Sequence, residues 1–278
     1  MPDEIERIPS MICLYEGAQE ANLHPAALAE YLGQWFSPSR TQIREEFARH
    51  HLRQGGQIDQ SAADSLASDF ANARIQDPAR QIQSPPSPPD PQNLAQEVSW
   101  LLQGSADPEV FYDGMKIQQS YLRLINPNEL SSDYLHIVIT NRLLGTWDPS
   151  DRRYHARVAI FGLPCLISTT GLVEAPAKPR EYYFGLMAGL EEEQLRAAME
   201  SRFVDYGDTR LTDLLKGYLM QALFYHLLAQ PFCDDPNCRL FNAHWQEQMI
   251  TAQLADGEEF CPRHRQLLGE LSRRKGDI

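Results

Sequence analysis

The sequence predicts an α/β fold in which a mixed sheet packs against one buried central helix. Residues 10–15 (SMICLY), 24–35 and 41–47 have the patterns of a strand, a helix and a second strand, the usual opening of an α/β layer. Residues 134–140 (YLHIVIT) are β-branched and bounded by turn-forming residues, which indicates a core strand. Residues 209–229 are apolar on nearly every face of a helix, which is typical of a helix buried on all sides.

The composition changes between residues 50 and 92, which are rich in Ala, Gln, Ser and Asp. Within this segment, residues 84–91 (SPPSPPDP) favour extended polyproline II conformation, because proline removes backbone donors. We therefore expect residues 50–92 to form a surface insertion with a stiff connector. The insertion would interrupt a single domain that spans residues 1–278.

The remaining elements follow from local patterns. Residues 93–103 have helical apolar spacing and are followed by Gly104, at which the helix is expected to end. Two strands are expected at 154–162 and 165–172, and the proline-punctuated tract 174–183 (EAPAKPREYY) is expected to be a loop. The other expected helices span residues 190–203, 242–255 and 262–273.

The charge of the chain excludes several classes of partner. The formal net charge is −13, so the surface should repel the phosphates of nucleic acids and of anionic membranes. The N-terminus is acidic and has no secretory pattern, and the longest apolar stretch, residues 217–233, is too short to span a bilayer. We expect a soluble, cytoplasmic protein without nucleic-acid or membrane partners. Nothing in the sequence indicates its oligomeric state.

Three cysteines and one histidine near the C-terminus have the spacing of a metal site. Cys233 and Cys238 enclose four residues, and Cys261 and His264 enclose two. Zinc prefers four tetrahedral sulfur and nitrogen donors, and each short spacing lets one turn supply two of them. With all four positions filled by protein, the single Zn²⁺ would be structural. The alternatives are a set with His244 in place of His264, or three buried thiols beside a surface histidine.

This layout resembles that of the archaemetzincins, whose protease helix HExxHxxGxxHC continues as C-x4-C-x-M and later C-x2-C. Here Cys233-x4-Cys238-x-Leu240 is followed by Cys261-x2-His264, with Leu for Met and His for the last Cys. The resemblance is strongest over residues 211–268. It implies a metzincin-like mixed sheet and a zinc knuckle in a C-terminal subdomain, residues 230–273.

The same register shows where the protease motif departs from the family pattern. The family's first His falls on Ala222, its catalytic Glu on Leu223, its second His on His226, its Gly on Ala229 and its third His on Phe232. A catalytic zinc needs three protein ligands, and a carboxylate must accept the proton of its water. No two of the eight histidines are four positions apart, so no other H-x-x-x-H exists. The resemblance therefore implies a degenerate relative of metallopeptidases, a pseudoenzyme with its structural zinc kept.

A ligand site can remain where the proteolytic one is lost. His226 is either an ordinary core histidine or a residue of the old cleft, and in the second case it is our catalytic candidate. The strand 165–172 would take the place of the edge strand that lines the metzincin cleft, and the loop after it would be adjacent. That loop offers groups for a peptide or a small anionic ligand, unless it is a solvated surface: Glu174, Lys178, Arg180 and Tyr182.

These observations leave three functions open. The first is a zinc-binding protein of the archaemetzincin type that binds a peptide or small anion without metzincin proteolysis. The second is an active metallopeptidase or other hydrolase with a non-standard site around His226, completed by His136 or His155. The third is an interaction scaffold that uses the knuckle and the proline-rich insert. The glycine motifs of nucleotide-binding proteins and of serine hydrolases are absent, and Cys165 lies in an apolar run that would keep its thiol inert.

Overall fold

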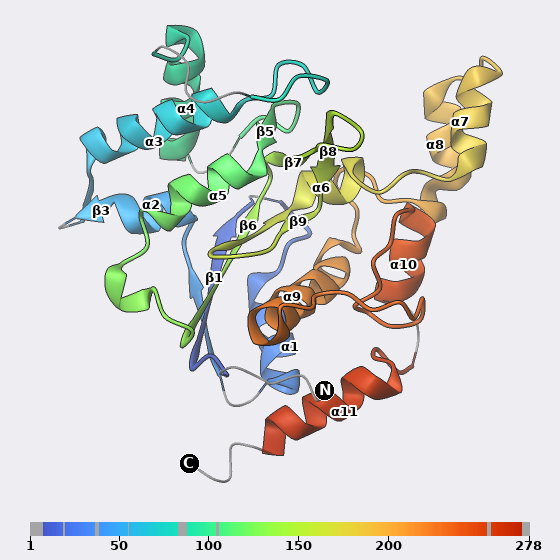
Figure 1. The fold of residues 1–278 in the computed structure, drawn as a ribbon. Coiled ribbons are helices and arrows are strands. Elements are labelled where there is room, and N and C mark those ends of the chain that lie inside the picture. Colours follow the sequence, from blue (N-terminus) through green and yellow to red (C-terminus); the bar gives the residue numbers. More distant parts are fainter. Residues whose placement is uncertain are drawn as a thin grey trace.

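A five-stranded sheet lies between two layers of helices (Figure 1). The computed structural model describes residues 8–18, 20–36, 39–54, 56–82, 88–103, 106–254 and 257–273. In this sheet β2, β1, β6 and β10 are parallel neighbours and β9 is antiparallel to β10, so the expected mixed sheet is confirmed. In order across the sheet the strands are β2 (Arg40–Arg44), β1 (Met11–Gly17), β6 (Tyr134–Thr140), β10 (Cys165–Ser168) and β9 (Ala159–Ile160).

Both faces of the sheet are buried, which explains why its strands are apolar runs. In β1, Ile12 and Leu14 belong to one hydrophobic core, whereas Cys13 and Tyr15 belong to another. Successive side chains of a strand point to opposite faces, so the two cores lie on opposite sides of the sheet. The strands expected at 10–15 and 134–140 are confirmed.

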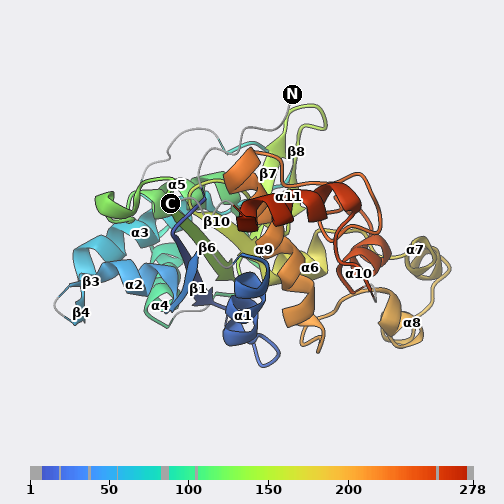
Figure 2. The ribbon, with the colours of Figure 1, turned by 90° about the horizontal axis from the view of Figure 1, so that it is seen from below.

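The first core is formed by the sheet and helices from both ends of the chain (Figure 2). The expected central helix is α9 (Leu211–Leu228), which is buried along most of its length. It ends at Ala229, whose left-handed backbone (φ 52°, ψ 21°) terminates the helix. The other helices on this side are α1 (Pro25–Trp35), α10 (Gln246–Leu254) and α11 (Pro262–Arg273).

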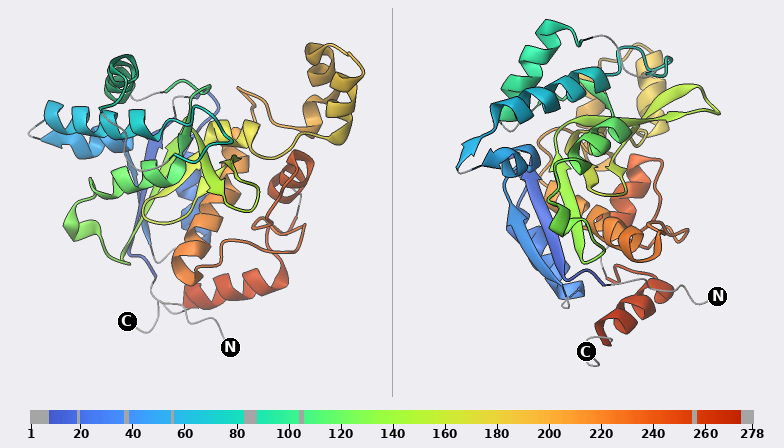
Figure 3. Two further views of the ribbon diagram at one scale, coloured as in Figure 1. Left: turned by 45° about the horizontal axis from the view of Figure 1, so that its top comes forward. Right: turned by 60° about the vertical axis from the view of Figure 1, so that its left-hand side comes forward.

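The second core corrects the expectation for residues 50–92. Helix α3 (Gln60–Ala73) lies in this segment, and its Leu66 and Phe70 are buried against the sheet, so this part is not a surface insertion. Residues 83–87 of the proline-rich run, and Gly104, lie outside the described residues. The helices on this side, visible in Figure 3, are α2 (Phe47–Leu52), α3, α4 (Pro91–Gln103) and α5 (Gly114–Leu122).

A second, smaller mixed sheet has the order β5–β7–β8, and the chain passes from its strand β8 to β9 of the first sheet. The strand expected at 165–172 ends at Ser168, whose hydroxyl accepts a hydrogen bond from Gly171 N at 2.8 Å and begins helix α6 (Thr169–Glu174). The edge of the large sheet is β9, and β10 is an inner strand, so the expected edge-strand assignment is wrong. The strands of the small sheet are β5 (Phe111–Asp113), β7 (Leu143–Asp148) and β8 (Arg153–Arg157).

The expected loop 174–183 and the helix after it form a helical hairpin that stands away from the body (Figure 1). Its helices are α7 (Arg180–Met187) and α8 (Glu192–Met199), with a small core of their own. None of the helices in the described ranges is long and apolar enough to cross a bilayer. The remaining short elements are β3 (Arg53–Gln54), β4 (Gln57–Ile58), η1 (Pro127–Glu129) and η2 (Glu200–Arg202).

Candidate metal centre

The first pair of cysteines lies on a turn directly after α9. The backbone N–H of Cys238 donates to Asp235 O at 3.0 Å, which closes the turn, and the N–H of Asp235 lies 3.4 Å from the sulfur of Cys233. Cys233 N donates to Leu240 O at 2.9 Å, so the chain doubles back beside the turn. This arrangement points the two thiols to the same side.

The second pair lies at the beginning of α11. Cys261 precedes Pro262, the first residue of the helix, and His264 is in the first turn. The N–H of Arg265 donates to Cys261 O at 3.0 Å. Both residues are therefore held by the first turn of one helix.

The distances between the four side chains fit a tetrahedral ion. Their ligand atoms all lie within 4.8 Å of one another. The sulfurs of Cys233 and Cys261 are 3.8 Å apart, and His264 Nδ1 lies 3.6 Å from the sulfur of Cys238 and 3.1 Å from that of Cys261. Zinc–sulfur and zinc–nitrogen bonds at tetrahedral angles place two sulfurs about 3.8 Å apart and sulfur and nitrogen about 3.6 Å apart. The cluster can therefore hold a metal ion, and zinc suits its donors.

Burial keeps the thiols of Cys233 and Cys238 in their neutral form in the absence of a cation. It raises the pKa of Cys238 to about 12 and also raises the pKa of Cys233, because desolvation disfavours the thiolates. It lowers the pKa of His264, which keeps the imidazole neutral and able to bind a metal. The backbone N–H groups of Leu240 and Cys261 point to the sulfur of Cys238 and partly stabilise its thiolate. A divalent cation would supply the remaining charge.

A cleft of about 430 Å³ lies close to this cluster, on the other side of Phe232. One wall is formed by residues 156–161 of β8 and β9, and the other by Tyr218 and Gln221 of α9 together with residues 241–244. Phe232, which precedes Cys233, lies in the lining and packs edge-on against the ring of Phe161. The oxygen of the Gln221 side chain is buried and has no hydrogen-bond partner among the described residues.

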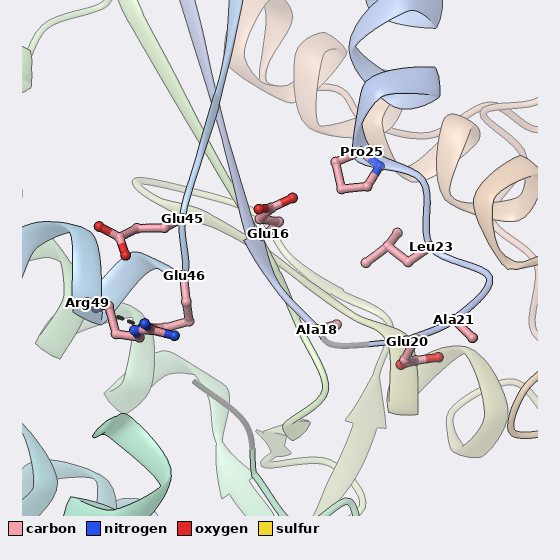
Figure 4. Close-up of a pocket in the computed structure, with 9 residues that line it drawn as sticks. All are labelled: Glu16, Ala18, Glu20, Ala21, Leu23, Pro25, Glu45, Glu46 and Arg49. Atoms are coloured by element: carbon pink, nitrogen blue, oxygen red, sulfur yellow. Dashed lines mark hydrogen bonds between the residues drawn. The ribbon is translucent and has the colours of Figure 1, made fainter. Parts of the chain in front are cut away.

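A second depression, at the carboxyl ends of β1 and β2, contains four glutamates (Figure 4). Glu46 is the most buried of them, and burial raises its pKa. Its carboxylate accepts a hydrogen bond from Arg49 N at 2.9 Å and thereby caps α2. Glu16, Glu20 and Glu45 belong to no group of metal-ligating side chains in the described part of the chain. Glu46 therefore has a structural role here.

Comparison with known proteins identifies the family. The model of a family described as "Probable metallopeptidase family (DUF6775)" matches residues 8–271. The chain belongs to this family. It is also similar to the crystal structure of an archaemetzincin from Methanopyrus kandleri, with 10% identity and a TM-score of 0.45, over 96% of this chain and 98% of that chain. No curated protein matches the sequence.

Membership of a probable metallopeptidase family confirms the kinship inferred from the cysteine spacing. The backbone of Ala229 agrees with the alignment of the protease motif on α9. Ala229 stands where the motif has its glycine, and it has the left-handed conformation that glycine adopts most readily.

The residues at the protease positions of the inferred register lie in different surroundings in this structure. Ala222 is buried within α9, and Phe232 lines the cleft. His226 donates from Nε2 to Ser132 O at 2.9 Å and is not part of the cleft lining. The rival ligand His244 lies at the rim of the cleft, away from the three cysteines that His264 joins.

The four ligand-binding candidates make contacts within the hairpin region and do not meet His226. Glu174 accepts a hydrogen bond from Tyr206 at 3.1 Å, and the hydroxyl of Tyr182 donates to Glu192 at 2.7 Å. The ammonium of Lys178 lies over the rings of Tyr182 and Phe203, and the guanidinium of Arg180 lies over Trp245. These contacts fix the hairpin on the body.

Sequence reasoning missed a second cluster, on the other side of the sheet. Cys13, Glu129 and His136 bring potential ligand atoms within 4.8 Å of one another. Tyr15 lies 2.9 Å from His136 Nδ1, and Arg44 donates to both oxygens of Glu129 at 2.8 Å. These residues come from β1, β2, β6 and η1, and no local motif joins them. Their signal is only the pairing of neighbouring strands, which a single sequence does not display.

Proposed function

We propose that this member of the DUF6775 family binds one structural zinc ion and an extended peptide, and that it does not carry out metzincin proteolysis. This proposal rests on the residues that occupy the three positions at which the family motif has its zinc-binding histidines. Ala222 and Phe232 cannot coordinate a metal, and the nitrogen Nε2 of His226 is used on Ser132. A single histidine would neither hold a catalytic zinc nor activate its water.

Cys233, Cys238, Cys261 and His264 would hold the structural zinc. Four protein donors leave no coordination position for substrate, so the ion supplies folding energy in place of catalysis. The cluster joins the end of α9, the turn after it and the start of α11, and a bound ion would add to the core packing and hydrogen bonds that hold these segments together.

The open edge of β9 supports peptide binding. Ser168 N donates to Val158 O at 2.7 Å, so Val158 and Ile160 direct their backbone groups toward β10. Backbone groups alternate in direction along an antiparallel strand, so the N–H and C=O of Ala159 face away from β10, on the side of the cleft. An extended peptide can add to such an edge through main-chain hydrogen bonds.

The cleft also offers side-chain contacts. Phe161 and Phe232 provide an aromatic wall for an apolar side chain. The unpaired oxygen of Gln221 is a buried acceptor, and an N–H of the ligand would remove the cost of leaving it unsatisfied.

Metal analysis combined with a peptidase assay tests the first half of the proposal. We expect one zinc per chain in the wild type and in His226→Ala, none in Cys238→Ser, and no cleavage of a randomised fluorogenic peptide library. Two zinc ions per chain, one of them lost in His226→Ala together with peptidase activity, would establish the rival reading of an active enzyme.

Selection of a randomised peptide library on the immobilised protein tests the second half. We expect enrichment of peptides with a large apolar residue, and at least a tenfold weaker affinity in Phe232→Ser, since a buried aromatic contact contributes about 1.5 kcal/mol or more. The matched control is Leu102→Ser, an exposed apolar residue of α4 remote from the cleft lining. Absence of any enrichment would refute peptide binding and leave the zinc assignment intact.

A further inference from the structure

The cleft continues into a second cavity of about 460 Å³. The two share four lining residues, which lie on β8, after α6 and in the loop before α10: Ala156, Arg157, Ala175 and His244. The first cavity is mostly apolar, whereas the second has a mixed lining in which charged side chains such as Arg153, Arg157 and Glu174 stand beside apolar ones. A ligand extended along β8 would pass from one environment into the other.

The second cavity contains an unusual concentration of cationic groups for a chain of net charge −13. Arg153, His155 and Arg157 alternate along β8 and therefore project to the same side of the strand. His244 faces them from the loop before α10.

The two arginines on this strand have no carboxylate partner among the described residues. Arg157 donates from Nε to the hydroxyl of Thr146 at 2.8 Å, and the guanidinium of Arg153 makes no hydrogen bond within those residues. Elsewhere in the described chain arginines such as Arg44, Arg142 and Arg202 are paired with glutamates. Unpaired arginines in a cavity are therefore open to an external anion.

Two carboxylates lie nearby and are already engaged. Asp151 approaches His155 Nε2 at 2.7 Å, and Glu174, which lines the cavity, accepts a hydrogen bond from Tyr206. Both contacts leave the guanidinium groups of Arg153 and Arg157 unneutralised.

From this arrangement we infer that the ligand is an acidic peptide, whose carboxylates bind Arg153 and Arg157 while its apolar side chain occupies the cleft. The inference rests on the proposed peptide binding and specifies the chemical class of the bound peptide. A guanidinium binds a carboxylate through two parallel hydrogen bonds, which gives both strength and orientation. We therefore assign carboxylate binding to the arginines of β8 and not to Lys178 and Arg180, which face aromatic rings.

The spacing on the strand limits the peptide. Residues 153 and 157 are four positions apart, which corresponds to about 13 Å along an extended chain. Because Arg157 lines both cavities, one acidic residue should lie within about two positions of the apolar anchor, and a second about four positions further on.

Three asparagine variants test the inference. Arg153→Asn and Arg157→Asn remove one cation each from the cavity. Arg152→Asn is the matched control: Arg152 is exposed, adds the same charge to the protein, and does not line the cavity. Its backbone has φ 52°, a left-handed conformation that asparagine tolerates.

The readout is the composition of peptides selected from a randomised library, followed by dissociation constants for one selected peptide and its Glu→Gln version. We expect selected peptides to carry Asp or Glu beside the apolar residue. Affinity should fall roughly tenfold in Arg153→Asn and in Arg157→Asn, and by less than twofold in Arg152→Asn. The Gln version should bind the wild type and Arg157→Asn equally well.

Three results would overturn the inference. Selected peptides without acidic residues would leave the cleft as a peptide site but remove the anion requirement. An equal loss in all three arginine variants would indicate a general charge effect. Competition by inorganic phosphate that is stronger than competition by the Glu peptide would assign the cavity to a phosphate group. If no peptide is enriched at all, the proposed peptide binding fails first and the inference falls with it.

Discussion

The C-terminal cluster and the cluster around Tyr15 contain similar side chains on opposite sides of the sheet, but they balance their charge differently. In the C-terminal cluster three thiols and one imidazole meet without a cationic side chain among them. Around Tyr15, the guanidinium of Arg44 lies against Glu129 and the tyrosine hydroxyl. The first cluster can hold an external cation, whereas the second contains a cationic side chain of its own.

The hydrogen bonds around Tyr15 also engage its hydroxyl and both ring nitrogens of His136. His136 Nε2 lies 3.2 Å from Glu129 O, a carbonyl that can only accept, so Nδ1 is left to accept the Tyr15 hydroxyl proton. Arg44 donates to the Tyr15 oxygen, and His51 Nε2, at 3.0 Å, must then donate to it as well. A metal ion would have to displace this network. Donor atoms that lie close together therefore indicate a metal site only where they are not already bound to cationic or hydrogen-bonding side chains of the protein.

The largest expected effect is loss of the metal from the C-terminal cluster. Cys238→Ser should bind no zinc and should unfold at least about 5 kcal/mol more easily, since structural zinc contributes about 10 kcal/mol or more in small knuckles. Cys13→Ser should keep the full zinc content. Metal analysis and urea unfolding check this, with and without a chelator. Equal zinc loss in both variants would show that the two clusters are alike after all.

A smaller effect is expected when the internal cation is removed from the cluster around Tyr15. Arg44→Met leaves Glu129 without its partner in a half-buried site, so the free energy of unfolding should fall by about 3 kcal/mol. Arg40→Met, on the same strand but exposed, should change it by less than about 0.5 kcal/mol. Urea titration of the two variants makes the measurement. If they proved equally stable, the charge balance described above would be wrong.

The smallest effect concerns pH. Burial lowers the pKa of His51 to about 3 and also lowers the pKa of His136, whereas both titrate near 6.5 in the unfolded chain. The unfolded state therefore takes up protons first, so stability is complete above pH 6.5 and is lost as the pH falls below it. For His51 the loss should be about 2 kcal/mol between pH 6.5 and 5. The slope of unfolding free energy against pH should be shallower in His51→Gln, and an unchanged slope would exclude this histidine as its source.

The two clusters also differ in how far the sequence reveals them. The four C-terminal donors occur as two short-spaced pairs, so a single stretch of sequence displays the whole set. The partners of Tyr15 are 29 to 121 positions away from it, and only the register of β1 with β2 and β6 brings them together. Strand register is a property of the whole sheet, which explains why this cluster was not predicted.

Among the elements, those with strong local patterns were predicted and those that depend on context were not. The continuous apolar runs of β1, β6 and α9 were sufficient to predict these elements. Helix α3 did not, because it is rich in alanine and polar residues and reaches the core with only a few large side chains. For the polar loop candidates ligand binding stays a prediction, because their charges also make contacts in the region of the α7–α8 hairpin, and nothing in a single sequence separates this use from ligand binding.

Phe232 and Cys233 are consecutive, one in the wall of the cleft and the other in the metal cluster, and Cys233 is bridged to Phe241 of the opposite wall. We therefore expect occupancy of one site to alter the free energy of binding at the other, and such linkage is reciprocal. We expect bound peptide to slow zinc release to a chelator, and zinc-depleted protein to bind peptide more weakly by the same factor. A protein built in this way would report the zinc supply of its surroundings through its affinity for a peptide.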